Sequence, residues 1–271
     1  MTGEGVLTVV QARMGSTRLP GKVMLPLAGR PALLLQLERL RASRLKGRLV
    51  VATTTDPADD VIERLARDNG FECFRGHPTD LLDRHVQAAR ACEARFVVKI
   101  PSDCPLVDPR VVDRVLERFL SAPGRWDYVS NLHPPTHPDG NDVEIMTLEA
   151  LETAWRNASA AFQREHTTPF LWDQPEWFRI GNVEWETGDD FSRTHRLTLD
   201  YPEDYEFLAA VCDALTRRGP LVPLEEIVAL LERRPGLLRI NARHAGVNWY
   251  WDHIEKLRTV PLHATRPPEF V

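Results

Sequence analysis

Hydrophobic and polar residues follow two alternating patterns through the first half of the chain. Short, continuously apolar runs predict buried strands, and they occupy residues 6–10, 48–53, 72–74 and 95–100. Between these runs the apolar residues have the spacing of amphipathic helices, over residues 31–41, 57–69, 80–90 and 109–120. Strands that are apolar on both faces and are separated by helices indicate a parallel sheet covered by helices on both sides.

The pattern becomes less regular after Ser121. Residues 121–140 hold four prolines and two glycines, which predicts a long surface loop. Further strands are expected at 141–146, 177–186 and 196–199, and further helices at 147–157, 202–215 and 223–233. We therefore expect one α/β domain over residues 1–245, with an insertion at about 121–195, and a peripheral, proline-rich tail at 246–271.

The composition is that of an ordinary globular protein: 271 residues, 43% hydrophobic and 27% charged, enough for a well-buried core. A net charge of −5 and a pI near 6.0 give no overall field that favours nucleic acid. The four cysteines form no CxxC pair and no secretory signal is recognisable, so a cytoplasmic protein with reduced thiols is expected. No apolar run approaches the ~20 residues of a membrane span, so no membrane partner is expected.

The first predicted strand runs directly into a loop of small and cationic residues, VVQARMGSTRLPGK (9–22). Ligands of open parallel sheets bind beyond the carboxyl ends of the strands. Small residues let backbone N–H groups approach an anion, and cations add positive charge, so the loop suits a polyphosphate. The residues concerned are Arg13, Gly15, Ser16, Arg18 and Lys22. The loop matches neither a Walker motif nor GxGxxG, and an inert basic loop is the alternative.

Two aspartates follow later predicted strands. Asp103 comes after the strand at 95–100 and Asp200 after the strand at 196–199, so both are expected at the sheet edge that carries the basic loop. Carboxylates in this position could hold Mg²⁺ together with substrate phosphates, whereas the alternative is a pair of turn aspartates. Asp108 is better explained as a helix cap. Two carboxylates and a cationic loop are the minimal set for metal-assisted nucleotidyl transfer.

The histidines indicate neither a zinc site nor a hydrolase. The spacing of His133 and His137 matches no zinc pattern, and Glu165-His166 lacks the HExxH sequence. No GxSxG motif accompanies them. A zinc enzyme and a serine hydrolase are therefore not expected.

Several motifs occur together in a fixed order: VVQARMGSTRLPGKVMLPLAGRP, VVATTTDPADD, RGHPTDLLDRHVQAA, KIPSDCPLVDP, DYVSN, PDGNDVEIMTLEAL, REHTTPF and LTLDYPEDYEF. The set resembles the cytidylyltransferases of the spore-coat polysaccharide biosynthesis protein F type, which are relatives of acylneuraminate (CMP-sialic acid) and CMP-Kdo synthetases. The resemblance covers about residues 6–240. It implies a three-layer α/β/α nucleotide-diphospho-sugar transferase (Rossmann-like) fold with a mixed, mostly parallel sheet.

The resemblance also implies an activity. CMP would pass from CTP to a small sugar, with a nonulosonic or other acidic sugar as the leading candidate, to give a CMP-sugar and pyrophosphate for surface polysaccharide or glycoconjugate biosynthesis. Mg²⁺ is the implied cofactor. The sequence does not set the oligomeric state, although relatives of the family are commonly dimers, which leaves a homodimer possible.

Site residues carry over from the family position by position. The triphosphate would be held by Arg13, Gly15, Ser16, Arg18 and Lys22, and the base and ribose would lie near Thr53, Thr54, Asp80 and Arg84. The metal ligands would be Asp103 and Asp200, which together with Arg13 and Lys22 would carry catalysis. The acceptor sugar would face Asn131, Asn141, Asp142, Glu144, Arg164 and His166. Arg164 or Arg193 could meet the carboxylate of an acidic sugar, and His166 could assist as a base. Ser102 stands where related enzymes often have glycine, which narrows the backbone freedom beside Asp103.

Two other functions remain open from the sequence. A nucleotide-binding module without turnover could keep the same fold. A glycosyltransferase that consumes a nucleotide sugar is the other alternative, although such enzymes generally carry a DxD motif and Asp103 is followed by Cys-Pro.

Overall fold

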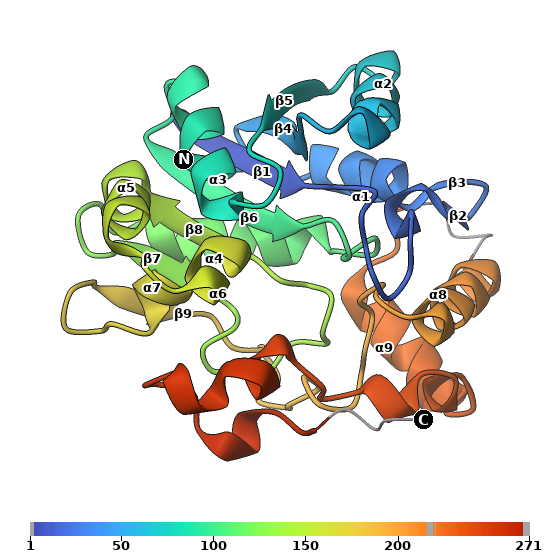
Figure 1. Cartoon of the computed structure of the whole chain (residues 1–271). Coiled ribbons are helices and arrows are strands. Elements are labelled where there is room, and N and C mark those ends of the chain that lie inside the picture. Colours follow the sequence, from blue (N-terminus) through green and yellow to red (C-terminus); the bar gives the residue numbers. More distant parts are fainter. Residues whose placement is uncertain (1–2, 216–218, 220, 268–271) are drawn as a thin grey trace.

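The computed structural model describes residues 3–215, 219 and 221–267. Within these residues one sheet of seven strands has the order β5-β4-β1-β6-β8-β7-β9 (Figure 1). The strands are β1 (Val6–Gln11), β4 (Arg48–Thr54), β5 (Glu72–Gly76), β6 (Phe96–Pro101), β7 (Tyr128–Ser130), β8 (Glu144–Thr147) and β9 (Ile180–Asn182). The neighbours β5, β4, β1 and β6 are parallel, whereas β8 is antiparallel to both β6 and β7. The expected mixed, mostly parallel sheet is confirmed.

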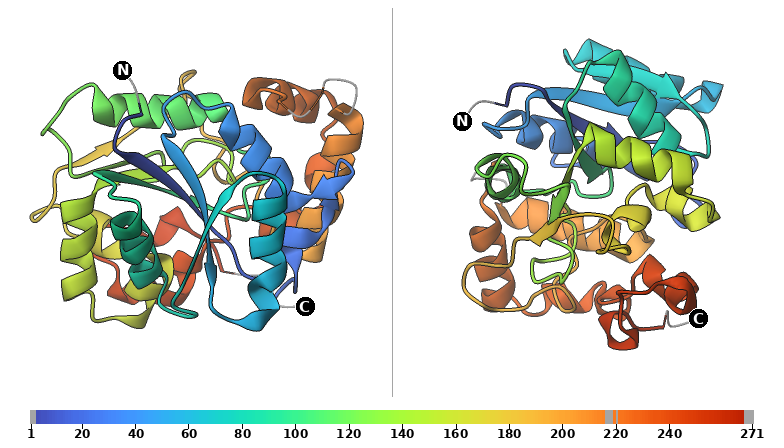
Figure 2. Two further views of the ribbon diagram at one scale, coloured as in Figure 1. Left: turned by 90° about the horizontal axis from the view of Figure 1, so that it is seen from above. Right: turned by 90° about the vertical axis from the view of Figure 1, so that its left-hand side faces the viewer.

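Helices cover both faces of this sheet (Figure 2). One core contains residues of α1 (Ala32–Arg41), α2 (Asp60–Asp68), α4 (Pro109–Leu120), α8 (Pro202–Leu215) and α9 (Leu224–Arg233). The other contains residues of α3 (Leu81–Ala91), α5 (Leu148–Asn157), α6 (Ala161–His166) and α7 (Pro169–Trp172). Successive side chains of a strand point to opposite faces, so Val6 and Val10 join the first core while Leu7 and Val9 join the second. This arrangement gives the expected three layers.

The predicted helix starts are supported by side-chain caps. Asp108 accepts a hydrogen bond from the N–H of Arg110 (2.8 Å) at the start of α4, which confirms its expected role as a cap. Asp80 accepts one from the N–H of Asp83 (2.9 Å) at the start of α3. These local signals explain why the helix boundaries agree with the sequence pattern to within a few residues.

Three elements of the second half differ from expectation. Residues 196–199 form no strand in the described structure, because their neighbour is an irregular loop that offers Arg196 only one isolated bridge, to Asp139. The strand expected at 177–186 is confined to β9. The three-residue strand β7 lies inside the expected loop at 121–140 and is too short to show an alternating pattern.

The remaining elements are short. A hairpin of β2 (Pro26–Leu27) and β3 (Arg30–Pro31) follows the loop after β1. Beyond α9 the chain continues through short 3₁₀ turns, and Trp249–Lys256 is the longest of these. Tyr250 and Leu257 from this segment are buried in the same core as α3 and α5. In the part of the chain described, no helix has the length and apolarity to cross a membrane.

Candidate active site

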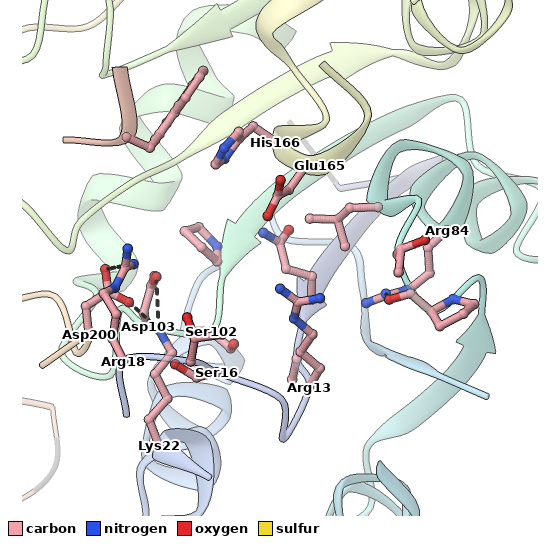
Figure 3. A pocket seen from close by; sticks show the side chains of 18 of the residues that line it. Arg13, Ser16, Arg18, Lys22, Arg84, Ser102, Asp103, Glu165, His166 and Asp200 are labelled. Atoms are coloured by element: carbon pink, nitrogen blue, oxygen red, sulfur yellow. Dashed lines mark hydrogen bonds and ion pairs between the residues drawn. The ribbon is translucent and has the colours of Figure 1, made fainter. Parts of the chain in front are cut away.

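A cavity of about 360 Å³ opens at the sheet edge where β1 and β6 end (Figure 3). Gln11 and Pro101, the last residues of these two strands, both line it. The rest of its wall comes from the loop after β1, the residues after β5 and β6, the start of α3, helix α6, Asp200 and the C-terminal segment beyond residue 246. Its polar lining includes Arg13, Ser16, Arg18, Lys22, Arg84, Ser102, Asp103, Glu165, His166 and Asp200.

Short hydrogen bonds fold the loop between Ala12 and Lys22 back on itself. The N–H groups of Ser16 and Gly21 both donate to the carbonyl of Met14, at 2.9 and 3.1 Å. Gly21 has a φ of 69°, a conformation that side chains disfavour. Gly15 has no such requirement, and it is exposed outside the lining of the cavity. Side chains of the loop line the cavity, whereas Gly15 does not.

Asp59 anchors this loop to the sheet. Its carboxylate accepts a hydrogen bond from the N–H of Met14 (2.7 Å) and another from the hydroxyl of Thr54. Asp59 is 3% exposed, so both bonds are shielded from water. Asp59 was not among the site residues expected from the sequence, although it belongs to the VVATTTDPADD motif.

Lys22 lies between the two expected metal ligands (Figure 3). Its Nζ is 2.5 Å from Asp200 Oδ1 and 3.5 Å from Asp103 Oδ2. Burial alone would lower the pKa of Lys22, but the two carboxylates outweigh it and raise the pKa, so the ammonium is charged.

Arg18 adds a second cation to the same carboxylates, with Nη2 3.0 Å from Asp200 Oδ2. Burial works to raise the pKa of Asp200, but Lys22 and Arg18 prevail and hold it well below its usual range. Arg13 lines the cavity as well, and it has no carboxylate partner within the described ranges. Its guanidinium is therefore available to an anionic ligand.

Backbone hydrogen bonds bring the two aspartates together. The N–H of Leu199 donates to the carbonyl of Asp103 (2.8 Å), which joins the segment before Asp200 to the loop after β6. The turn after Asp200 is held by Asp204, whose Oδ2 accepts the N–H groups of Asp200 and Tyr201, both at 3.0 Å. Asp204 in turn pairs with the buried Arg196 (2.9 Å). The convergence expected of Asp103 and Asp200 is thus present, although no strand carries Asp200.

The donor set around Lys22 fits a hard divalent cation. Mg²⁺ prefers carboxylate oxygens and keeps positions for water and substrate phosphate. Carboxylate oxygens of Asp103 and Asp200 both lie near the ammonium group of Lys22, so the space between the two aspartates favours a positive charge. No cluster of three or more metal-ligating side chains occurs among the described residues, so a metal here would take its other ligands from phosphate and water.

The far end of the cavity is organised by Arg84. This buried side chain donates to the carbonyl of His77 (3.0 and 2.8 Å) and to that of Pro78 (3.1 Å). Burial lowers its pKa to about 10. Pro78, Thr79 and Leu81 line the cavity beside it. Arg84 therefore shapes this wall of the cavity.

Three residues expected near the base or ribose lie outside the cavity lining. Thr53 and Thr54 are buried within β4, 0% and 2% exposed, and the hydroxyl of Thr54 is used on Asp59. Asp80 caps α3 and pairs with Arg164 (2.9 Å). Their positions give these residues supporting contacts, with no direct access to a ligand in this cavity.

A second cavity, of about 250 Å³, adjoins the first, and Asp103, His166 and Asp200 line both. Of the six residues expected at the acceptor sugar, Asp142 and His166 face it. Burial lowers the pKa of His166 to about 3, so its ring is neutral, and the ring stacks on Trp249 with centroids 3.8 Å apart. Burial raises the pKa of Asp142, and the neighbouring Asp139 and Asp103 raise it further.

The other four expected acceptor residues have structural contacts. Asn131 donates to the carbonyl of Asn141 (2.8 Å), and Asn141 accepts a hydrogen bond from the N–H of Asp108 (2.9 Å). Glu144 is 1% exposed and accepts hydrogen bonds from Lys99 and from the hydroxyl of Tyr128. None of these residues lines either cavity, and neither does Arg164.

Several residues that line the second cavity were missed from the sequence. Lys99 and Arg196 supply cations, and Trp249 and Trp251 supply indole rings. A lysine within the apolar run FVVKI and the aromatic cluster NWYWD were usable signals. The aromatic cluster belongs to the tail at 246–271, which was expected to be peripheral. In the structure, residues 247–249, 251 and 252 of this tail line the second cavity.

The fold and these cavities define a class of protein. A mostly parallel sheet, with a cationic loop after its first strand and two aspartates at the same edge, is the arrangement of a nucleotidyltransferase. The family model described as cytidylyltransferase matches residues 7–239. The chain belongs to the cytidylyltransferase family, which confirms the resemblance seen in its motifs.

Individual relatives agree with this assignment. The spore coat polysaccharide biosynthesis protein SpsF of Bacillus subtilis is 32% identical, over 85% of this chain and 95% of its own. A cytidylyltransferase structure from Leptospira borgpetersenii serovar Hardjo-bovis has 34% identity and a TM-score of 0.82, covering 86% of this chain and 96% of its own. A CMP:2-keto-3-deoxy-manno-octonic acid synthetase complexed with CTP has 18% identity and a TM-score of 0.60, covering 77% and 98%, and it shares the fold.

Proposed function

We propose that this cytidylyltransferase transfers CMP from CTP to a hydroxyl group of a small sugar and releases pyrophosphate. The observation that carries the proposal is the meeting of a cationic loop and two aspartates in one cavity, with Lys22 Nζ 2.5 Å from Asp200 and 3.5 Å from Asp103. The neighbouring cavity supplies space for a second substrate beside the same aspartates.

The loop cations would bind the triphosphate. Arg13, Arg18 and Lys22 would stabilise the negative charge that grows on the pyrophosphate as its bond to the α-phosphorus breaks. The sugar oxygen would form the new bond to that phosphorus from the opposite side, and its hydroxyl proton would pass to water or to the departing pyrophosphate. The cytosine and ribose would lie beside Pro78, Thr79 and Arg84 at the far end of the cavity. Most of the rate acceleration would come from positioning and from this fixed positive charge.

Asp103 and Asp200 would hold Mg²⁺. The bound ion would neutralise part of the phosphate charge. Lys22 would keep Asp200 ionised and would orient both carboxylates until substrate enters, because its ammonium already contacts them.

His166 would position the attacking hydroxyl. It faces both cavities and is neutral, so a ring nitrogen could accept a hydrogen bond from the sugar. With its pKa lowered to about 3, the imidazole is a weak base. We therefore assign orientation to His166 and not removal of the proton.

The proposed acceptor is an acidic sugar. Support comes from the names of relatives, since the synthetase that shares the fold acts with a 2-keto-3-deoxy-octonic acid. The cations that line the acceptor cavity are Arg18, Lys99 and Arg196. Arg164 is used by Asp80, and Arg193 lines a separate small cavity. Lys99 and Arg196 line the acceptor cavity, whereas Arg164 and Arg193 do not. Each already pairs with a carboxylate, Glu144 and Asp204, so a sugar carboxylate would share these cations.

The test is a screen of CTP and UTP against a panel of keto-acid and neutral sugars with Mg²⁺. Pyrophosphate release and product mass should identify a CMP-sugar, formed with CTP and an acidic sugar. Asp103→Asn should reduce turnover by about 10²–10³-fold, whereas Asp68→Asn, on the exposed end of α2, should leave it unchanged.

Three results would contradict the proposal. Near-normal turnover of Asp103→Asn would remove the metal assignment. CTP binding without product over the whole panel would favour a nucleotide-binding module. Transfer from a CMP- or UDP-sugar, with CTP inert, would favour a glycosyltransferase.

A further inference from the structure

The C-terminal segment reaches back to the active site, although it lies outside the part of the chain that defines the family. The match to the cytidylyltransferase family ends at residue 239. Figure 1 shows the segment in red, running below the sheet edge that carries the site. Residues of this segment line both cavities. Trp249 and Asp252 line the first and the second, His253 lines the first alone, and Val247, Asn248 and Trp251 line the second alone.

The segment is firmly attached to the body of the protein. Tyr250 is 7% exposed and packs on Trp172, with ring centroids 5.6 Å apart. Further along, the carboxylate of Asp173 accepts hydrogen bonds from the N–H of Arg258 (2.9 Å) and from the N–H of Thr259 (2.7 Å). These contacts hold the residues between them in a defined position against α7. Trp249 and Trp251 therefore belong to a built wall of the site.

The two indoles on this wall have different surroundings. Trp249 stacks on His166 at 3.8 Å and 11°, so one of its faces supports the side chain that faces both cavities. Trp251 is partly buried, lines the second cavity and makes no aromatic contact with any described residue. The same cavity carries the charged groups of Lys99, Asp142 and Arg196. An apolar ring wall facing polar groups matches a sugar ring, which has C–H faces and a hydroxylated edge.

We propose that residues 247–252 form an acceptor-recognition arm. Trp251 contacts a C–H face of the acceptor ring, Trp249 holds His166 against the attacking hydroxyl, and the polar groups opposite bind the remaining substituents. Within the arm, Trp251 selects the sugar, because it lines the second cavity alone, whereas Trp249 and Asp252 also border the cavity proposed for CTP. This inference rests on the proposed cytidylyl transfer, and its acceptor class is a pyranose-forming keto-acid sugar.

The test compares Trp251→Ala, Trp251→Phe and the control Trp177→Ala. Trp177 is 56% exposed and lines neither cavity. The acceptor is the sugar of highest turnover in a panel that includes 3-deoxy-manno-octulosonate and N-acetylneuraminate. Trp251→Ala should raise the KM for this sugar about tenfold, the loss expected for one aromatic contact. The KM for CTP should remain within twofold, and Trp251→Phe should recover most of the loss.

A measurement that does not depend on turnover accompanies the kinetics. Calorimetric titration with CTP and Mg²⁺ should give the same Kd for the wild type, Trp251→Ala and Trp177→Ala. Thermal unfolding of each variant checks that the fold is intact. A weakened CTP Kd in Trp251→Ala would overturn the inference by making the arm part of the nucleotide site.

The two proposals fail differently. An active wild type whose Trp251→Ala variant keeps the same acceptor KM would overturn the recognition arm and leave cytidylyl transfer standing. A wild type that binds CTP but forms no product with the panel would overturn the proposed function, and the arm's role as acceptor site with it.

Discussion

At the scale of single residues, the protonation states in the site depend on how buried cations and carboxylates compensate one another. Lys22 is surrounded by carboxylates strongly enough that its pKa rises in spite of burial. Asp200 remains ionised for the same reason. A lysine at this position is therefore an electrostatic partner of the aspartates. In the proposed function it is also a ligand for phosphate, so its removal should affect both roles.

Lys22→Ala should lower kcat/KM by about 10²–10³-fold, because a fixed donor to the developing phosphate charge is lost. It should also raise the pKa of Asp200, since the carboxylate then lacks its nearest cation. Pyrophosphate release measures the first effect. Lys256→Ala, exposed and outside both cavities, is the control and should behave as wild type. Equal turnover of the two variants would contradict the role of Lys22.

At the scale of elements, the loop after β1 owes its shape to a contact from a different strand. Thr54, at the end of β4, holds Asp59, and Asp59 holds the backbone of Met14. Thr54 was expected near the base from its motif. Its position instead indicates a supporting role, which the sequence could not reveal because strand neighbours are set by the order of the sheet.

Asp59→Ala should weaken CTP binding about tenfold, because the partly buried N–H of Met14 loses its acceptor and the loop loses its fixed shape. An unsatisfied buried donor costs about 1–3 kcal/mol, which spans that loss. Thr54→Val is the matched variant: it keeps the bond between Met14 and Asp59 but removes the hydroxyl that holds Asp59, so its CTP Kd should weaken by less than that of Asp59→Ala. Calorimetry measures both. An unchanged Kd in Asp59→Ala would show that the loop keeps its shape without this anchor.

The difference between local signals and contacts with distant segments also explains which elements were predictable from the sequence. The helix at 109–120 was predictable from the Asp108 cap and an apolar stripe, because both signals come from residues close together in the sequence. Residues 196–199 are as apolar as a strand, yet they lie beside a loop that cannot extend a ladder of hydrogen bonds. Polar residues of the motifs can also be buried. The hydrogen bonds of Asn131, Asn141 and Glu144 are made inside the protein and not to a cavity.

At the scale of the whole molecule, one buried ion pair connects distant parts of the chain to the site. Arg196 and Asp204 are 4% and 0% exposed, and Asp204 also accepts a hydrogen bond from Asn241 (3.0 Å), just before the C-terminal segment. The same carboxylate holds the turn after Asp200. This pair couples the sheet edge that carries Asp103 and Asp200 to α8 and to the base of the arm.

Asp204→Ala should destabilise the fold by about 3–5 kcal/mol, because it leaves the guanidinium of Arg196 buried with incomplete compensation. Denaturant unfolding measures the change. Glu176→Ala removes a partner from the exposed pair with Arg258 and should change stability little, since water screens that pair. Comparable losses in the two variants would contradict the connecting role of Asp204.

The sequence by itself determined the class of this protein: periodicity predicted an α/β sheet, and the order of its motifs indicated a cytidylyltransferase. Periodicity and motifs are both read from residues that are close together in the sequence, so they can be recognised without knowledge of the fold. Tertiary structure alone decided which polar side chains meet. It placed Lys22 between Asp103 and Asp200, buried Thr53 in β4 and brought Trp251 from the tail to the second cavity. Contacts between residues far apart in the chain depend on packing and burial, and local pattern does not encode them.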